Sequence, residues 1–167
     1  CVDCASGRIV FDLKVFDVER PEPIAPINSY ASPTGALEEG RFYAHFGTYG
    51  TACIDTATGR VLWTRRDLNC DHHEGPGASV MLHEGLLYVP VDGRDVQYLA
   101  ALDAKTGRTV WKTDRSVDYG RFFPNLRKCF CAPILIEADG RTQVFSPAAK
   151  AAMAYDPRTG EELWKLP

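Results

Sequence analysis

Long apolar stretches are missing from this chain: no run approaches the ~18 residues that a membrane-spanning helix needs. The chain also has little excess of either sign of charge: its 167 residues include 19 Lys and Arg and 22 Asp and Glu, which gives a formal net charge of −3. Such a balanced chain generates no field that would attract nucleic acid. We therefore predict neither a membrane span nor nucleic-acid binding.

Two cysteine motifs of redox proteins are also missing. No two of the six cysteines are adjacent, and Ala5 follows the Cys1–Cys4 pair where a haem-attachment motif has histidine. Only that pair has the spacing of a zinc half-site, whereas a closed zinc site usually takes two such pairs. We therefore interpret the cysteines mainly as free thiols, which pack as small hydrophobic side chains.

The chain does contain an internal repeat. An aspartate is followed at the third position by Ser or Thr, then by glycine, and four residues later by Trp or Phe. Four copies occur, and their aspartates lie 52, 48 and 53 residues apart. The copies are Asp3-Ser6-Gly7-Phe11, Asp55-Thr58-Gly59-Trp63, Asp103-Thr106-Gly107-Trp111 and Asp156-Thr159-Gly160-Trp164. Regular spacing of this kind indicates repeated structural units.

Each full repeat predicts four strands. Short apolar stretches precede a glycine at 33–37, 79–82 and 133–136, and strand-like runs follow that glycine at 41–46, 86–91 and 141–145. A third strand then leads into the Asp-x-x-Thr-Gly turn, and a fourth strand carries the tryptophan. Four-stranded units of ~40–50 residues indicate a β-propeller, in which each unit is one blade.

The motif has a mechanical interpretation. The aspartate carboxylate can accept hydrogen bonds from N–H groups two or three residues on, and glycine adopts positive φ without steric cost. A blade cannot bury both of its faces alone, and a tryptophan offers a large rigid contact to its neighbour. We therefore predict a structural docking role for Asp55, Gly59, Trp63, Asp103, Gly107, Trp111, Asp156, Gly160 and Trp164.

At these residues the chain resembles the pyrroloquinoline-quinone (PQQ) type of β-propeller repeat, whose motif is Ala-x-Asp-x-x-x-Gly-x-x-x-Trp. The copies at 101–111 and 154–164 match throughout, whereas Cys53 replaces the alanine in the second copy. In the first copy Cys1 replaces the alanine and Phe11 the tryptophan. The resemblance implies an all-β fold: part of a seven- or eight-bladed quinoprotein-like propeller, with about three and a half four-stranded blades in this chain.

The repeat also predicts the domain organisation. We expect a single propeller fragment over 1–167, with a half blade at 1–16 and blades at about 27–66, 76–115 and 129–167. Cys1 aligns with Cys53 inside a strand, so we interpret it as a repeat position rather than a lipid-modified N-terminus. The expected partners are then the remaining blades of the same propeller.

The resemblance implies that long loops between blades share one face, where family members bind ligands. The densest polar cluster lies in such a loop: Asp71, His72, His73 and Glu74 are candidate metal ligands, since His and carboxylate suit zinc, iron or copper. Adjacent residues point in different directions, so all four cannot bind one ion. The alternative is a polar loop whose side chains hydrogen-bond to each other and to the next blade.

Other residues are weaker candidates for a functional site, and we expect them to have structural roles. The basic residues of the same loop face would be solvated and paired with nearby aspartates. We expect His45 to be a hydrogen-bonded core histidine. Tyr43, Tyr49, Tyr88 and Tyr98 are interpreted as packing between blades. The basic residues are Arg65, Arg66, Arg115, Arg121, Arg127, Lys128 and Lys150.

Two classes of function follow from the resemblance. The first is an extracytoplasmic binding or protein-interaction scaffold of a bacterium, periplasmic or secreted, taking a protein or a small-molecule ligand at the loop face. The second is an enzyme: a fragment of a quinoprotein-type oxidoreductase, or a metal-dependent enzyme with its site at the channel mouth. PQQ is implied by the resemblance alone, because the adjacent cysteines that cover it in quinoprotein dehydrogenases are missing here.

Overall fold

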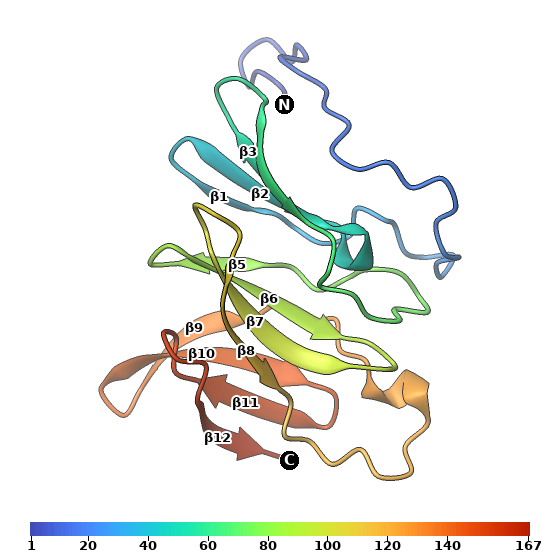
Figure 1. Cartoon of the computed structure of the whole chain (residues 1–167), viewed down its shortest axis with the longest axis vertical. Coiled ribbons are helices and arrows are strands. Elements are labelled where there is room, and N and C mark those ends of the chain that lie inside the picture. The colour runs from blue at the N-terminus through green and yellow to red at the C-terminus, as the bar shows by residue number, and fades with distance from the viewer.

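The computed structural model describes all 167 residues and consists almost entirely of β-strands (Figure 1). Twelve strands form three four-stranded antiparallel sheets, in which neighbouring strands follow one another along the chain. This confirms the prediction of an all-β fold built from four-stranded propeller blades. No helix is long and apolar enough to cross a membrane.

The three sheets span 36–65, 81–114 and 134–166, and two short 3-10 helices lie between strands. The first sheet contains β1 (Ala36–Glu38), β2 (Arg41–His45), β3 (Thr51–Asp55) and β4 (Val61–Arg65), with η1 (Gly47–Tyr49) between β2 and β3. The second contains β5 (Met81–His83), β6 (Leu86–Asp92), β7 (Gln97–Asp103) and β8 (Thr109–Asp114). After η2 (Pro124–Arg127), the third contains β9 (Ile134–Ala138), β10 (Arg141–Ala148), β11 (Ala151–Tyr155) and β12 (Glu162–Leu166).

The first sixteen residues form no regular strand. Val2 and Ile9 make an isolated antiparallel bridge around a turn, and the Asp3 carboxylate accepts a hydrogen bond of 2.7 Å from the Ser6 N–H. The ring of Phe11 lies against Gly59 of the first sheet. This segment therefore has the turn of the repeat but not its sheet.

The Asp-x-x-Thr-Gly turns share one hydrogen-bonding pattern. The Asp55 carboxylate accepts hydrogen bonds from the N–H and the hydroxyl of Thr58, both at 2.8 Å. Asp103 and Asp156 do the same with the threonine of their own turns. The glycine that closes each turn has φ between 71° and 72°, a region that disfavours side chains. The aspartate, threonine and glycine of the motif thus build the turn itself.

The tryptophan of each turn reaches the next sheet. Trp63 Nε1 donates a hydrogen bond of 2.9 Å to the carbonyl of Ala104, and its ring covers Gly107 in the same turn. Trp111 Nε1 donates a hydrogen bond of the same length to the carbonyl of Pro157, and its ring covers Gly160. Consecutive sheets are therefore linked by one ring-on-backbone contact each. We propose that this contact is the dock that sets the spacing between blades.

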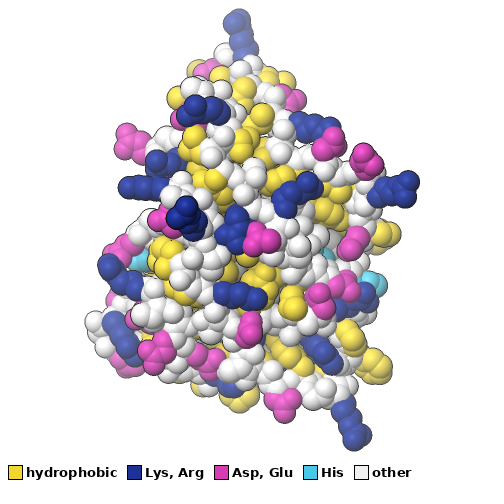
Figure 2. All heavy atoms as spheres, in the orientation of Figure 1, with side chains coloured by type: hydrophobic (Ala, Val, Ile, Leu, Met, Phe, Trp, Pro, Cys, Tyr) yellow, Lys and Arg dark blue, Asp and Glu magenta, His cyan; other side chains and the backbone are white.

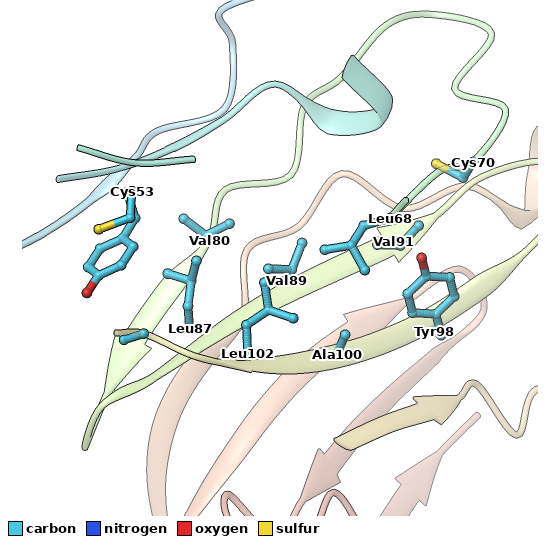
Figure 3. Packing of buried hydrophobic residues seen from close by; sticks show 12 residues of the cluster. Cys53, Leu68, Cys70, Val80, Leu87, Val89, Val91, Tyr98, Ala100 and Leu102 are labelled. Atoms are coloured by element: carbon cyan, nitrogen blue, oxygen red, sulfur yellow. The ribbon is translucent and has the colours of Figure 1, made fainter. Parts of the chain in front are cut away.

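Two buried clusters fill the spaces between the sheets. In one, Tyr43 and Cys53 of the first sheet join Leu87, Val89 and Leu102 of the second (Figure 3). In the other, the opposite face of the second sheet contributes Tyr88, Leu99 and Trp111, and the third sheet contributes Val144, Met153 and Tyr155. Because successive strand residues point to opposite faces, the middle sheet is apolar on both sides.

The two outer faces of the stack remain partly uncovered. On the first sheet, Leu37 is 70% exposed, and an apolar hollow of about 490 Å³ separates that face from residues 11–15. On the third sheet, Ile134 is 52% exposed, and Trp164 bonds only to Gln143 of its own sheet, at 2.7 Å. These are the faces onto which we propose that further blades pack.

The dock predicts a specific sensitivity at Gly107. Its φ of 71° matches the 70° of Gly140, so alanine is equally strained at both positions, at about 1 kcal/mol. An added Cβ at Gly107 would lie 2.7 Å from Trp63 Cδ2, whereas nothing lies within 4 Å at Gly140. In urea denaturation, we expect Gly107→Ala to lower the free energy of unfolding by about 2 kcal/mol more than Gly140→Ala. Equal losses would contradict the dock.

Candidate functional site

The loops that connect consecutive sheets lie on one side of the stack. In the view of Figure 1 they occupy the right side, together with η1 and η2, while the Asp-x-x-Thr-Gly turns lie on the left. We call this side the loop face. Residues 17–35, 66–80 and 115–133 each lead into the first strand of a sheet there. Side chains placed far apart in the sequence therefore meet on this face.

A groove of about 330 Å³ lies where these three segments meet. Ile27 is fully exposed at its rim, and Phe130 is 41% exposed. Grooves that combine apolar and polar walls are the usual form of ligand and peptide sites. The groove, which we call the mouth groove, is lined by Ala25, Ile27, Asn28, Glu74, Gly77 and Phe130.

An ion pair closes one side of the mouth groove. The Lys128 ammonium pairs with Glu74 Oε2, and the Lys128 side chain is only 4% exposed against 47% for Glu74. This contact holds the pKa of Glu74 below its ordinary value. The amide of Asn28 donates to the carbonyls of Glu74 and Pro76, at 2.6 and 3.1 Å, and so fixes the loop backbone. The charges beside the groove are thus paired with each other.

The four candidate metal ligands are not brought together. Asp71 pairs with Arg94 at 2.6 Å, and His72 Nε2 accepts the N–H of Thr48 at 3.0 Å. His73 has a φ of 61° and lines a separate polar hollow with Asp71, while Glu74 turns to Lys128. Nowhere in the chain do three His, Cys, Asp or Glu side chains gather as a metal site requires. In this structure Asp71, His72 and Glu74 each bind a residue outside the loop, and so they tie the loop to its neighbours.

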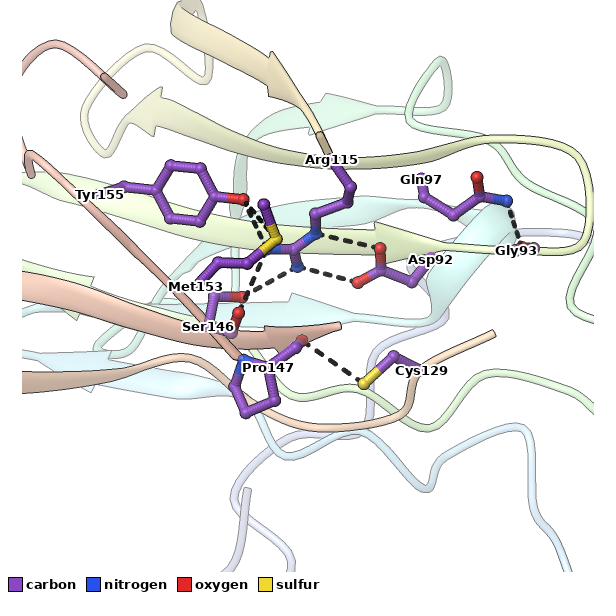
Figure 4. Close-up of polar contacts among 9 residues, drawn as sticks. All are labelled: Asp92, Gly93, Gln97, Arg115, Cys129, Ser146, Pro147, Met153 and Tyr155. Atoms are coloured by element: carbon purple, nitrogen blue, oxygen red, sulfur yellow. Dashed lines mark hydrogen bonds and ion pairs between the residues drawn. The ribbon is translucent and has the colours of Figure 1, made fainter. Parts of the chain in front are cut away.

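A buried ion pair lies behind the loop face, where the sequence predicted solvated charge (Figure 4). The side chains of Arg115 and Asp92 are 0% and 1% exposed, and two hydrogen bonds of 2.9 and 3.1 Å join them. Arg115 also donates to Ser146 Oγ at 2.9 Å and to the Tyr155 hydroxyl at 3.2 Å. The expectation of a solvated Arg115 is therefore wrong, because the guanidinium links the second sheet to the third.

One signal in the sequence could have indicated this pair. Asp92 directly follows the apolar run 86–91, so its side chain enters the space between sheets unless the strand bends away. A carboxylate in that position needs a cation or several hydrogen-bond donors. The cation that reaches the Asp92 carboxylate is determined by how the third sheet packs, and the sequence around Asp92 does not predict that packing.

The buried pair also braces the segment that borders the mouth groove. The carbonyl of Asp92 accepts the N–H of Cys129 at 3.4 Å, and the Cys129 thiol donates to the carbonyl of Pro147 at the same distance. Burial raises the pKa of Cys129 to about 12, so its thiol stays protonated. The hydroxyl of Tyr119 is buried nearby without a hydrogen-bond partner. Lys128 is therefore anchored through the residue that follows it.

His45 is the last residue of β2 and lies close enough to His72 for the two rings to interact electrostatically. It is 5% exposed, and its Nδ1 lies 2.9 Å from Thr51 Oγ1, which confirms the expected core histidine. Burial, with a smaller contribution from His72, lowers the pKa of His45 to about 4. Burial lowers the pKa of His72 as well. Both rings are therefore neutral at neutral pH.

The buried ion pair predicts strong non-additivity. Arg115→Met leaves the Asp92 carboxylate buried without its cation, and we expect a loss of about 3–5 kcal/mol in the free energy of unfolding. The double variant Asp92→Leu/Arg115→Met removes both charges, so it should lose less than the single variant. A double-mutant cycle by urea denaturation measures the difference. Additive losses would contradict direct pairing.

His45 predicts a pH dependence. Its pKa is lower in the folded chain, about 4, than its ordinary value of 6.5, so the unfolded chain binds a proton that the folded chain refuses. Below pH 6.5 stability should fall, at most by about 1.4 kcal/mol per pH unit, until about pH 4. Above pH 6.5 this residue contributes no slope. Urea midpoints of His45→Gln should fall less steeply with acid than those of the parent, and parallel curves would refute this origin.

Both the fold and the repeat define a PQQ-type propeller repeat protein. A family model described as outer membrane protein assembly factor BamB, PQQ_2, matches residues 1–167. The chain belongs to this family. The resemblance inferred from the tryptophan motif is thereby confirmed.

Individual relatives fall into two groups. The chain is 30% identical over 126 residues to the quinohemoprotein alcohol dehydrogenase ADH-IIG of Pseudomonas putida. This match covers 68% of this chain and 16% of that protein. The quinohemoprotein alcohol dehydrogenase of Comamonas testosteroni superposes with a TM-score of 0.61 at 25% identity, over 81% of this chain and 21% of that one. BamB from Moraxella catarrhalis superposes with a TM-score of 0.55 at 17% identity, over 81% of this chain and 36% of that one. This likeness shows the fold alone.

Proposed function

We propose that this chain is part of an extracytoplasmic bacterial propeller that acts as a binding scaffold and takes a protein segment in the mouth groove. The family description, an outer membrane protein assembly factor, supports a role outside the cytoplasm. The chain spans less than a quarter of the length of the dehydrogenases that it resembles. The scaffold role is therefore proposed for the longer protein of which this chain would form a part.

The mouth groove is the observation that carries this proposal. Its apolar rim, with Ile27 and Phe130 exposed, offers surface that a partner would cover. Its charges are already neutralised by the pairing of Glu74 with Lys128, so a partner need not supply a counter-ion. The walls come from three loops held by hydrogen bonds, such as those of Asn28. A largely preformed groove of this kind binds without a large ordering cost.

A quinoprotein oxidoreductase is the second candidate, and the 30% identity to ADH-IIG favours it. PQQ is a planar quinone that carries carboxylates, so its site must provide cations. Beside the mouth groove Lys128 is occupied by Glu74, and Arg115 is committed to Asp92. Neither cation is therefore free to hold a carboxylate of the cofactor, so the mouth groove does not fit PQQ, and a quinone site would lie in another part of the propeller.

The test is a site-specific photo-crosslink in the full-length protein inside its native cells. A benzophenone side chain at position 27 should form one discrete protein adduct, because that position is fully exposed at the groove rim. Phe130→Asp, which places a charge on the apolar wall, should abolish the adduct. The same probe at Val110, which is 51% exposed on β8 of the middle sheet, is the matched control.

Two results would overturn the scaffold. One is an absence of adducts at position 27 beyond those formed by the probe at Val110. The other is saturable binding of PQQ by the full-length protein together with alcohol-dependent reduction of a dye, which would establish the oxidoreductase instead.

A further inference from the structure

Large apolar side chains are exposed at the tip of the loop between the second and third sheets. Phe123 is 78% exposed, Leu126 48% and Phe122 41%. All three lie in or next to η2, at the edge of the molecule where Figure 2 shows hydrophobic side chains beside basic ones. We call residues 119–127 the aromatic tip. Single exposed apolar residues are ordinary, but a contiguous group marks a contact surface.

The exposure of these rings is fixed by the loop itself. Tyr119 is buried and anchors the tip, and its carbonyl accepts the N–H of Phe122 at 2.8 Å. The carbonyl of Phe123 accepts the N–H of Leu126 at 2.8 Å, and Pro124 begins η2. The Arg127 guanidinium donates to the carbonyl of Phe122 at 3.1 Å. The tip is thus a folded projection that holds its rings toward solvent.

The aromatic tip is surrounded by positive charge. Arg121 precedes the two rings in the sequence and Arg127 follows them, and Lys150, from the turn between β10 and β11, holds its ammonium 5.1 Å from the centre of the Phe122 ring. None of these three cations forms an ion pair. The carboxylate of Asp118 instead accepts the N–H of Gly120. The tip is therefore a basic patch on a chain whose net charge is −3.

We infer that the aromatic tip is a peripheral membrane contact that inserts Phe122 and Phe123 among anionic phospholipid headgroups. Aromatic rings are favoured at the headgroup level, and basic residues at that depth are attracted to anionic lipid. The loop that carries the tip projects beyond the sheets (Figure 1), and its cations form no ion pairs, which suits a flat anionic surface. The groove that suits a protein segment lies elsewhere, at the mouth groove. This contact lies on the surface and involves no membrane span.

The experiment is sedimentation of the full chain with vesicles. Vesicles of phosphatidylcholine with about one third phosphatidylglycerol should pellet the protein, whereas phosphatidylcholine alone should not, and salt should weaken the binding. Arg121→Gln/Arg127→Gln should lower the partition coefficient about 25-fold, because each basic residue at such a surface contributes about fivefold. Phe122→Ser/Phe123→Ser should reduce it at least as much, because insertion scales with buried apolar area.

Matched variants keep the test specific. Ile9→Ser/Val10→Ser removes two exposed apolar side chains elsewhere, and Arg60→Gln/Arg108→Gln removes two exposed arginines, so both should bind as the parent does. In Phe123→Trp, the new indole should be quenched by brominated lipid. The inference is overturned if the parent does not pellet with anionic vesicles, if it pellets equally with neutral ones, or if the tip variants bind as well as the matched controls.

Discussion

A tryptophan ring lying on the backbone of the next turn is the interaction on which the arrangement of the sheets depends. The ring needs a glycine beneath it, because any Cβ at Gly107 would overlap Trp63. That glycine needs its turn, and the turn is held by an aspartate that accepts hydrogen bonds from its own threonine. Each residue of the motif is therefore required by another. We propose that this interdependence is why the motif recurs as a unit.

Because the docks lie on one side of the stack, the loops on the other side are free to differ. The loop face carries a groove, a buried ion pair and an aromatic tip, and none of them is repeated from blade to blade. Arg115 shows how such a loop is integrated, since it joins Asp92 to the third sheet and so steadies the segment that begins at Lys128. The repeated side supplies the frame, and the unrepeated side supplies whatever chemistry distinguishes this protein.

The sequence predicts the strands and turns well, because both depend on local signals: alternating burial, glycine at positive φ, and the reach of an aspartate within four residues. It predicts the loop face poorly. Asp71 and Glu74 are close in sequence and are predicted together as candidate metal ligands. In the structure they pair instead with Arg94 and Lys128, which lie 23 and 54 residues away along the chain. Arg115 looks like a loop charge, yet it is buried by strands that follow it. Such contacts require the packed structure.

The most direct test of the dock compares two tryptophans in the same chain. Trp111 covers a glycine of the next sheet, whereas Trp164 contacts only its own. We predict that Trp111→Ala lowers the free energy of unfolding by about 3–5 kcal/mol in a urea titration, and that Trp164→Ala costs clearly less. A loss below about 1 kcal/mol for Trp111→Ala, or equal losses at the two positions, would contradict the dock as the organising interaction.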